Sequence, residues 1–357
     1  MLRRLKAPAI RSTASLVEAL GAYADAADGA RPIADTFREL RSLADGIRAA
    51  FSLEPVVPVV HTLPLVEGPV PASLALGAAV RTRVPFVVVR HRALLVQYFL
   101  EGEPRTLLWN PTDVPRALRV RALDPLRQGV GRFAATFALR TFAAVDSQLG
   151  ALGVSPDSVD LLLFDQLDGQ DPAAALARFP RARVLLASRE WTRFHDPPAK
   201  DRGFILRGPE LSPDRVDRYE HGLKLGDGIA LVRTGGRHDG HQCLVVRTSL
   251  GVLVASGNAL AIDGYAPRAS RLPGLSEHAR NANVDFVPAF PSVGGHAAEA
   301  MAIEYSLADR LPDAPVWPFV LPSLELIRSK IAPGIRPSAS APDLSLGTIS
   351  RTRVRRR

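Results

Sequence analysis

The chain has 357 residues, of which 46% are apolar and 23% charged, the balance of a globular protein with a sizeable core. No uncharged apolar run reaches the roughly 18 residues of a membrane span, and no apolar stretch follows the basic N-terminus as it does in a secretory signal. Cys243 is the single cysteine, which excludes an intrachain disulfide and favours a reducing compartment. We therefore expect a cytoplasmic protein without membrane association.

The formal net charge of +9 is concentrated at the two ends of the chain. Residues 1–11 carry a net charge of +4 and residues 334–357 carry +5, so the body between them is formally neutral. A neutral body argues against a nucleic-acid-binding face, although basic tails can still associate with polyanions.

The first expected elements are two helices. Apolar residues recur at helical spacing between residues 16 and 23 and again between 33 and 47, with a break at residues 29–32. Short β-rich runs follow between residues 54 and 109. Residues 113–153 are expected to be mainly helical.

Strands and helices then alternate along the chain. The stretch Val159–Phe164, which is apolar except for Asp160, is typical of a buried central strand, and Pro172–Phe179 predicts a short helix after it. Further strands are expected at Arg183–Ala187, Ile229–Arg233, Cys243–Thr248 and Val252–Ala255. His296–Asp309 predicts a helix.

The chain is expected to divide into three parts. Residues 1–52 form an N-terminal helical extension, and residues 53–333 form the main domain. Residues 334–357 are rich in Ser, Pro and Arg, and this composition predicts a disordered basic tail.

Two short stretches carry most of the functional information. The first, Leu161–Leu176, reads LLLFDQLDGQDPAAAL and predicts a strand that continues into a loop and a helix. The second, Leu231–Val246, reads LVRTGGRHDGHQCLVV and predicts two strands joined by a glycine-rich turn.

The two stretches resemble the metallo-β-lactamase superfamily, particularly its lactonase-like and glyoxalase II-like branches. In that family an apolar strand ends in Thr-His-x-His-x-Asp-His, and Thr-Pro-Gly-His-Thr-Pro-Gly-His, Gly-Asp and Gly-His follow further on. Weaker similarities lie at Leu152–Asp160, Phe179–Arg183 and Arg189–Trp191. The resemblance covers residues 80–295 and implies an α/β fold: a four-layer αββα sandwich, with two mixed β-sheets packed face to face and helices outside.

The resemblance also shows that the metal-binding chemistry has been replaced. The family's ligand positions fall on Gln166, Asp168, Gln170, Asp171, Arg237 and Asn258, and the last one falls near Phe290. The family's metal ions lower the pKa of bound water to about 7 and so create a hydroxide nucleophile. Amides are weak ligands for such ions, and an arginine keeps its proton and repels them. The resemblance therefore implies a degenerate site with no metal or other cofactor.

The replacement residues suggest an electrostatic substitute for the ions. Asp168 and Asp171 supply negative charge and Arg237 supplies positive charge at the corresponding positions. Because an unpaired buried charge is strongly unfavourable, we expect Arg237 to pair with one or both aspartates.

Two histidines in the second stretch leave an alternative open. His238 and His241 lie in one turn with Asp239, and the simpler interpretation is a hydrogen-bonded loop. The alternative is a rebuilt site for zinc or another divalent metal that also uses Asp168 or Asp171.

Three functional hypotheses follow. The favoured one is a non-catalytic binding or regulatory protein that holds a small-molecule ligand in the old active-site cleft. The second is a hydrolase of an ester, lactone or thioester with a rebuilt site, and the third is a polyanion-associated protein that uses its basic tails. The candidate pocket residues are Gln166, Asp168, Gln170, Asp171, Arg237, His238, His241 and Asn258.

Overall fold

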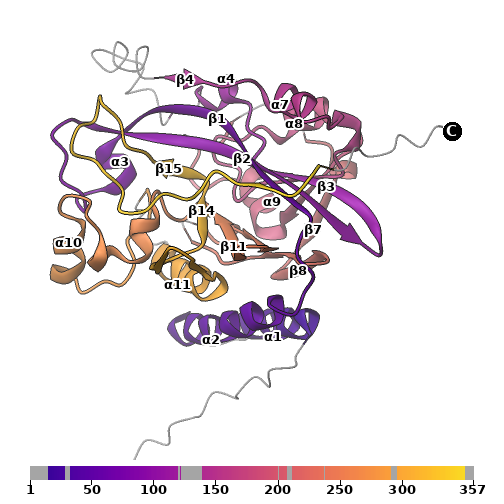
Figure 1. Cartoon of the computed structure of the whole chain (residues 1–357), viewed down its shortest axis with the longest axis horizontal. Coiled ribbons are helices and arrows are strands. Elements are labelled where there is room, and N and C mark those ends of the chain that lie inside the picture. The colour runs from indigo at the N-terminus through magenta and orange to yellow at the C-terminus, as the bar shows by residue number, and fades with distance from the viewer. Residues whose placement is uncertain are drawn as a thin grey trace, which may run out of the picture.

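The two main β-sheets lie face to face, and helices cover both outer faces (Figure 1). This four-layer αββα sandwich confirms the expected fold class. The computed structural model describes residues 15–28, 33–119, 121, 139–199, 201–206, 211–236, 238–290 and 296–349.

The larger sheet follows the order β16-β1-β2-β3-β5-β6-β7, with β4 paired to β1 and β15 paired to β2. β1, β2 and β3 are antiparallel, whereas β3, β5, β6 and β7 run parallel to one another. The strands are β1 (Val59–Pro71), β2 (Phe86–Leu100), β3 (Glu103–Trp109), β4 (Arg140–Thr141), β5 (Leu161–Leu163), β6 (Arg183–Ala187), β7 (Val216–Tyr219), β15 (Leu324–Leu326) and β16 (Ser345–Leu346).

The smaller sheet follows the order β14-β11-β10-β9-β8. β8 to β11 are antiparallel neighbours, and β14 lies parallel to β11. The strands are β8 (Gly222–Gly226), β9 (Ile229–Val232), β10 (Cys243–Thr248), β11 (Gly251–Ser256) and β14 (Val320–Pro322), and a separate pair is formed by β12 (Arg310–Leu311) and β13 (Ala314–Pro318).

The central strands carry long apolar runs because both of their faces are buried. Leu94 and Val96 of β2 pack between the sheets, whereas Leu95 faces the helices on the outer side. On β10, Leu244 lies between the sheets, whereas the buried Cys243 faces the helices that cover the smaller sheet. This two-residue alternation explains why burial on both sides requires a continuous apolar run.

Different helices cover the two outer faces. α7 (Val145–Ala151), α8 (Pro172–Arg178) and α9 (Ser188–His195) pack on the larger sheet, and α1 (Leu16–Asp28), α2 (Ile33–Phe51) and α11 (Ala297–Leu307) pack on the smaller one (Figure 1). Three further α-helices are α3 (Ala72–Leu76), α4 (Val114–Ala117) and α10 (Leu275–Asn281). Among the described residues, no helix is long and apolar enough to cross a bilayer.

The N-terminal helices are a layer of the domain itself. Tyr23 of α1 and Ile47 of α2 are fully buried, in the same hydrophobic cluster as Val232 of β9 and Met301 of α11. Residues 15–28 and 33–51 therefore complete the core of the smaller sheet, and the boundary expected after residue 52 does not separate two cores.

The expected disorder of residues 334–357 is wrong for residues 334–349. β16 pairs with β1, and the side chains of Ile335, Ala341 and Leu344 are buried. The Asp343 carboxylate also lies 2.7 Å from the Arg92 guanidinium. These few buried apolar side chains hold the polar segment against the core. The average composition of the segment does not predict their burial. Residues 350–357 lie outside the described part of the chain.

Leu344→Ala tests whether the C-terminal segment is part of the core. We expect the free energy of unfolding to fall by about 2–5 kcal/mol, because the change leaves a cavity beside β1. Leu250→Ala, at a position that is 44% exposed, is the matched control and is expected to have little effect. Equal small losses in urea denaturation of the two variants would contradict this packing.

Candidate functional site

A pocket of about 210 Å³ lies where β5 ends, beside the connection from β14 to β15. Its walls are mainly apolar and include Val66, Val89, Phe204 and Phe290. The polar residues that line it are His91, Thr112, Asp165, Gln166, Asp168, Gln170 and Ser323.

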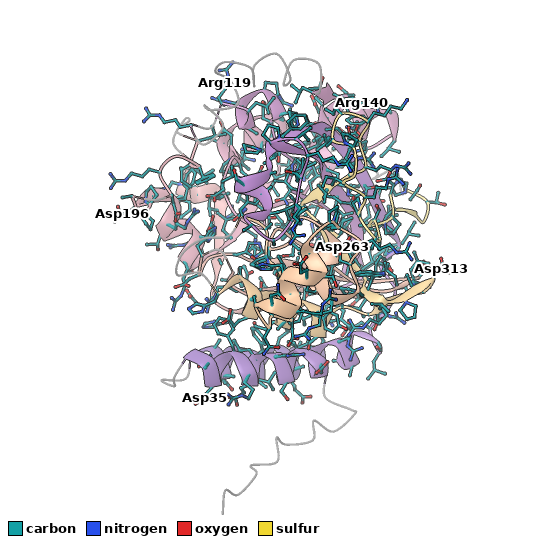
Figure 2. The ribbon with its side chains drawn as sticks, turned by 90° about the vertical axis from the view of Figure 1, so that its left-hand side faces the viewer. Asp35, Arg119, Arg140, Asp196, Asp263 and Asp313 are labelled. Carbon is teal, nitrogen blue, oxygen red and sulfur yellow. The ribbon has the colours of Figure 1, made fainter. Side chains whose placement is uncertain are left out.

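The pocket lies on the side of the molecule away from the N-terminal helices. Two further wall residues, Leu118 and Leu139, adjoin Arg119 and Arg140 in the chain. Figure 2 places these two arginines at the end of the molecule opposite Asp35 of α2.

Asp165 is the first residue of the motif loop that reaches the pocket, and its side chain is buried. Its carboxylate accepts a hydrogen bond from the Gln166 backbone N–H at 2.7 Å. Burial raises the pKa of Asp165 to about 6, although hydrogen bonds from Ser323 and Asn110 oppose that rise. Gly257 permits this placement, because a Cβ there would lie 2.4 Å from Asp165 Oδ2. The sequence analysis did not select Asp165, which stands where the family motif has threonine.

Gln170 belongs to a short chain of hydrogen bonds along the pocket wall. Thr112 Oγ1 lies 2.6 Å from Gln170 Oε1 and 2.6 Å from His91 Nε2. His91 Nδ1 lies 2.8 Å from the Ser323 carbonyl oxygen, which can only accept, so this nitrogen donates. Burial lowers the pKa of His91 to about 4, and the ring is therefore neutral at pH 7.

Asp168 pairs with Arg193, a residue that the sequence analysis did not select. Arg193 Nη2 lies 2.6 Å from Asp168 Oδ1, and the same guanidinium lies 3.1 Å from Asp201 and 3.4 Å from Glu190. All four side chains are at most 10% exposed. The i,i+3 spacing of Glu190 and Arg193 on α9 was the available sequence signal, because it places both on one face of the helix.

His238 is joined to this cluster through Glu190. Its Nδ1 lies 3.1 Å from Glu190 Oε2, and its Nε2 lies 3.1 Å from Gln166 Oε1. Glu190 Oε1 accepts from the Leu167 backbone N–H at 2.6 Å, and burial raises the pKa of Glu190 to about 7. Gly240 allows the close approach, since a Cβ there would lie 2.5 Å from Glu190 Oε2.

His241 and Asn258 belong to a separate buried network around Glu304. Asn258 Nδ2 donates to Glu304 Oε1 at 2.8 Å and lies 3.3 Å from His241 Nδ1, while the Gly257 backbone N–H donates to His241 Nε2. Burial lowers the pKa of His241 to about 3. Glu304 also accepts hydrogen bonds from Thr234, Ser256 and Tyr265.

Asp171 has a structural role at the start of α8. Its Oδ1 accepts from the Ala174 backbone N–H at 2.9 Å, which caps the helix. Its Oδ2 lies 2.8 Å from Arg116 Nη1.

The structure thus separates the predicted site residues into groups. Gln166, Asp168 and Gln170 line the pocket. Asp171, His238, His241 and Asn258 do not line it and lie in the neighbouring networks. Arg237 lies outside the described residues, so its pairing with the aspartates stays a prediction, although each aspartate has another arginine partner.

The described side chains do not fit a divalent metal site. Three of the family's ligand positions hold the amides Gln166, Gln170 and Asn258, and the carboxylate of Asp168 is bound to a guanidinium. Among the residues that the structure describes, no group of three His, Cys, Asp or Glu side chains is placed to hold a metal ion. The expectation of a metal-free protein remains open to metal analysis.

The chain is similar to several solved structures that are described as hydrolases or lactonases. It is 14% identical to a probable metal-dependent hydrolase from Staphylococcus aureus, over 58% of this chain and 75% of that one, with a TM-score of 0.45. It is 16% identical to a quorum-quenching N-acyl homoserine lactone lactonase, over 64% and 88% of the two chains, with a TM-score of 0.45. It is 14% identical to a hydrolase in the beta-lactamase superfamily, over 83% and 99%, also with a TM-score of 0.45.

No family model and no curated protein matches the sequence.

Arg193→Met tests the charge balance of the cluster. Removing the cation leaves Asp168, Glu190 and Asp201 buried together, and we expect a loss of about 3–5 kcal/mol in the free energy of unfolding. Arg189→Met removes an exposed pair with Asp239 on the same helix and is expected to lose at most about 1 kcal/mol. Similar losses in the two variants would show that the cluster does not depend on Arg193.

His241→Asn tests the buried neutral imidazole through its effect on acid stability. The folded-state pKa of His241 is about 3, below the unfolded value of 6.5, so the unfolded state binds the proton first as the pH falls. The stability that His241 contributes is complete above pH 6.5 and is lost on acidification, by about 2 kcal/mol at pH 5.

The measurement is the free energy of unfolding by urea at several pH values between about 7 and 5. We expect the variant to lose less stability over this range than the wild type. His195→Asn, at an exposed position on α9, is measured beside it as the matched substitution. Identical pH slopes for His241→Asn and the wild type would contradict a neutral buried ring.

Proposed function

We propose that this protein binds a small, largely apolar molecule in the pocket and does not act as a metal-dependent hydrolase. Concave sites with apolar walls and a few converging polar groups are the usual form of small-molecule binding sites. This pocket has apolar walls around Val66, Val89 and Phe290, and its polar groups gather at Asp165 and Gln170.

One observation carries the proposal: the ion pair between Asp168 and Arg193. The two groups are 2.6 Å apart and their side chains are 6% and 7% exposed. A divalent ion bound at Asp168 would have to approach or displace a buried guanidinium, and Arg193 would lose a partner on which its burial depends. Asp168, at a position where the family has a metal ligand, is therefore paired with the permanent positive charge of Arg193.

The alternative of a rebuilt hydrolase has less support. Its candidate residues were Asp168, Asp171, His238 and His241. Asp171 is engaged in capping α8 and in its ion pair with Arg116, and His241 is fully buried beside Asn258. These groups do not converge on one space that a substrate could enter. The polyanion hypothesis stays a prediction, because most of the tail arginines lie outside the described residues.

Metal analysis combined with a binding assay tests the proposal. We expect sub-stoichiometric zinc and no turnover of lactone or thioester substrates, even with zinc added. A neutral, apolar fluorescent dye such as N-phenyl-1-naphthylamine should bind at one site. Ala117→Phe, which fills the pocket from α4, should abolish dye binding, whereas Ala151→Phe at the exposed end of α7 should not.

Two results would overturn the proposal. One is stoichiometric zinc accompanied by turnover. The other is dye binding that is equally strong in the Ala117→Phe and Ala151→Phe proteins.

A further inference from the structure

The polar end of the pocket carries a negative charge that has no cationic partner among the residues described. Asp165 lines the pocket and is 2% exposed, and the groups that bind its carboxylate are the neutral donors of Gln166, Asn110 and Ser323. None of the ion pairs found in the described part of the chain includes Asp165. A buried carboxylate that is held only by neutral groups is unfavourable unless a cation approaches it.

The surrounding described residues do not offset this charge. Those that line the pocket include no lysine or arginine, and the second carboxylate among them, Asp168, is paired with Arg193. His91 is neutral, because burial lowers its pKa to about 4. The remaining polar residues of the lining are uncharged, so the floor offers carboxylate and amide oxygens, and the walls offer hydrocarbon.

We infer that the molecule that occupies this pocket is a cationic amine with an apolar body, whose ammonium group pairs with Asp165. The inference rests on the proposed binding function and adds the chemical class of the ligand to it. An ammonium group has three donors and a positive charge, and charge-assisted hydrogen bonds are about twice as strong as neutral ones. An alcohol would bring one donor and no positive charge to Asp165, and a carboxylate would be repelled.

Three small compounds of nearly equal size probe the charge preference of this pocket of about 210 Å³. Hexylamine, hexan-1-ol and hexanoate share a six-carbon chain, and each is smaller than the dye. These three compounds therefore differ mainly in the charge that they bring to Asp165.

Isothermal calorimetry or ligand-observed NMR with the three compounds tests the inference at neutral pH, where the ammonium group is fully charged. For the full-length wild-type protein we expect hexylamine to bind at least about tenfold more tightly than hexan-1-ol, and hexanoate more weakly than either. Hexylamine should also displace the neutral dye.

Asp165→Asn should weaken hexylamine binding by at least about tenfold and leave hexan-1-ol within about threefold of its wild-type affinity. Asp157→Asn, at an exposed position outside the pocket, removes the same charge from the chain and should change neither affinity. If Asp165→Asn does not fold, the order of the three compounds on the wild type still decides the question, with Ala117→Phe as the blocked-pocket control.

The outcomes separate the two proposals. Dye binding without a preference for the amine would overturn the inference and leave the proposed function intact. Tighter binding of hexanoate than of hexylamine would also overturn the inference. Loss of the amine preference in Asp157→Asn would show that net charge, and not Asp165, attracts the amine. Absence of dye binding, together with zinc-dependent turnover, would overturn the proposed function itself.

Discussion

The site depends on the ion pairs that the buried Arg193 guanidinium forms with three carboxylates. The guanidinium lies within 3.4 Å of Asp168, Glu190 and Asp201, which come from three separate segments of the chain. Each carboxylate would be strongly disfavoured in this buried position without a cation, and the cation would be disfavoured without them. The cluster thereby fixes the motif loop after β5 against α9 and brings the segment around Asp201 to the same point.

The position of the pocket follows from this anchoring. Asp168 pairs through its backbone with Ile205, and the Gly169 N–H donates to the Phe204 carbonyl, so the loop and the Phe204 wall are held together. Asp165 then points to the pocket floor, where Gly257 leaves room for its carboxylate. Arg193 neutralises Asp168, whereas the Asp165 carboxylate forms no ion pair in the described part of the chain.

The candidate site was predictable only where local sequence determined the contact. The Leu161–Leu176 stretch supplies several residues of the pocket lining, because an apolar strand followed by polar residues places those residues at the strand's end. The selection of residues within it was less successful: Asp165 matched no ligand position in the motif, and Asp171 proved to be a helix cap. Arg193 escaped notice because two of its three partners, Asp168 and Asp201, are 25 and 8 residues away in opposite directions along the chain, and only its i,i+3 spacing with Glu190 leaves a local signal.

The sequence by itself determined which strands are buried on both faces, because the apolar runs in β9 and β10 leave no polar side to face water. The four-layer arrangement was implied only by the resemblance of the two motif stretches to a known family. Only the tertiary structure decided that residues 334–349 contribute side chains to the core. It also decided that Asn258, beside His241, donates a hydrogen bond to Glu304, and that Arg193 pairs with Asp168, a position at which the resemblance implied a metal ligand. The physical reason is that burial patterns are local and repeat along the chain, whereas the partner of a buried charge is selected by the packing of distant segments.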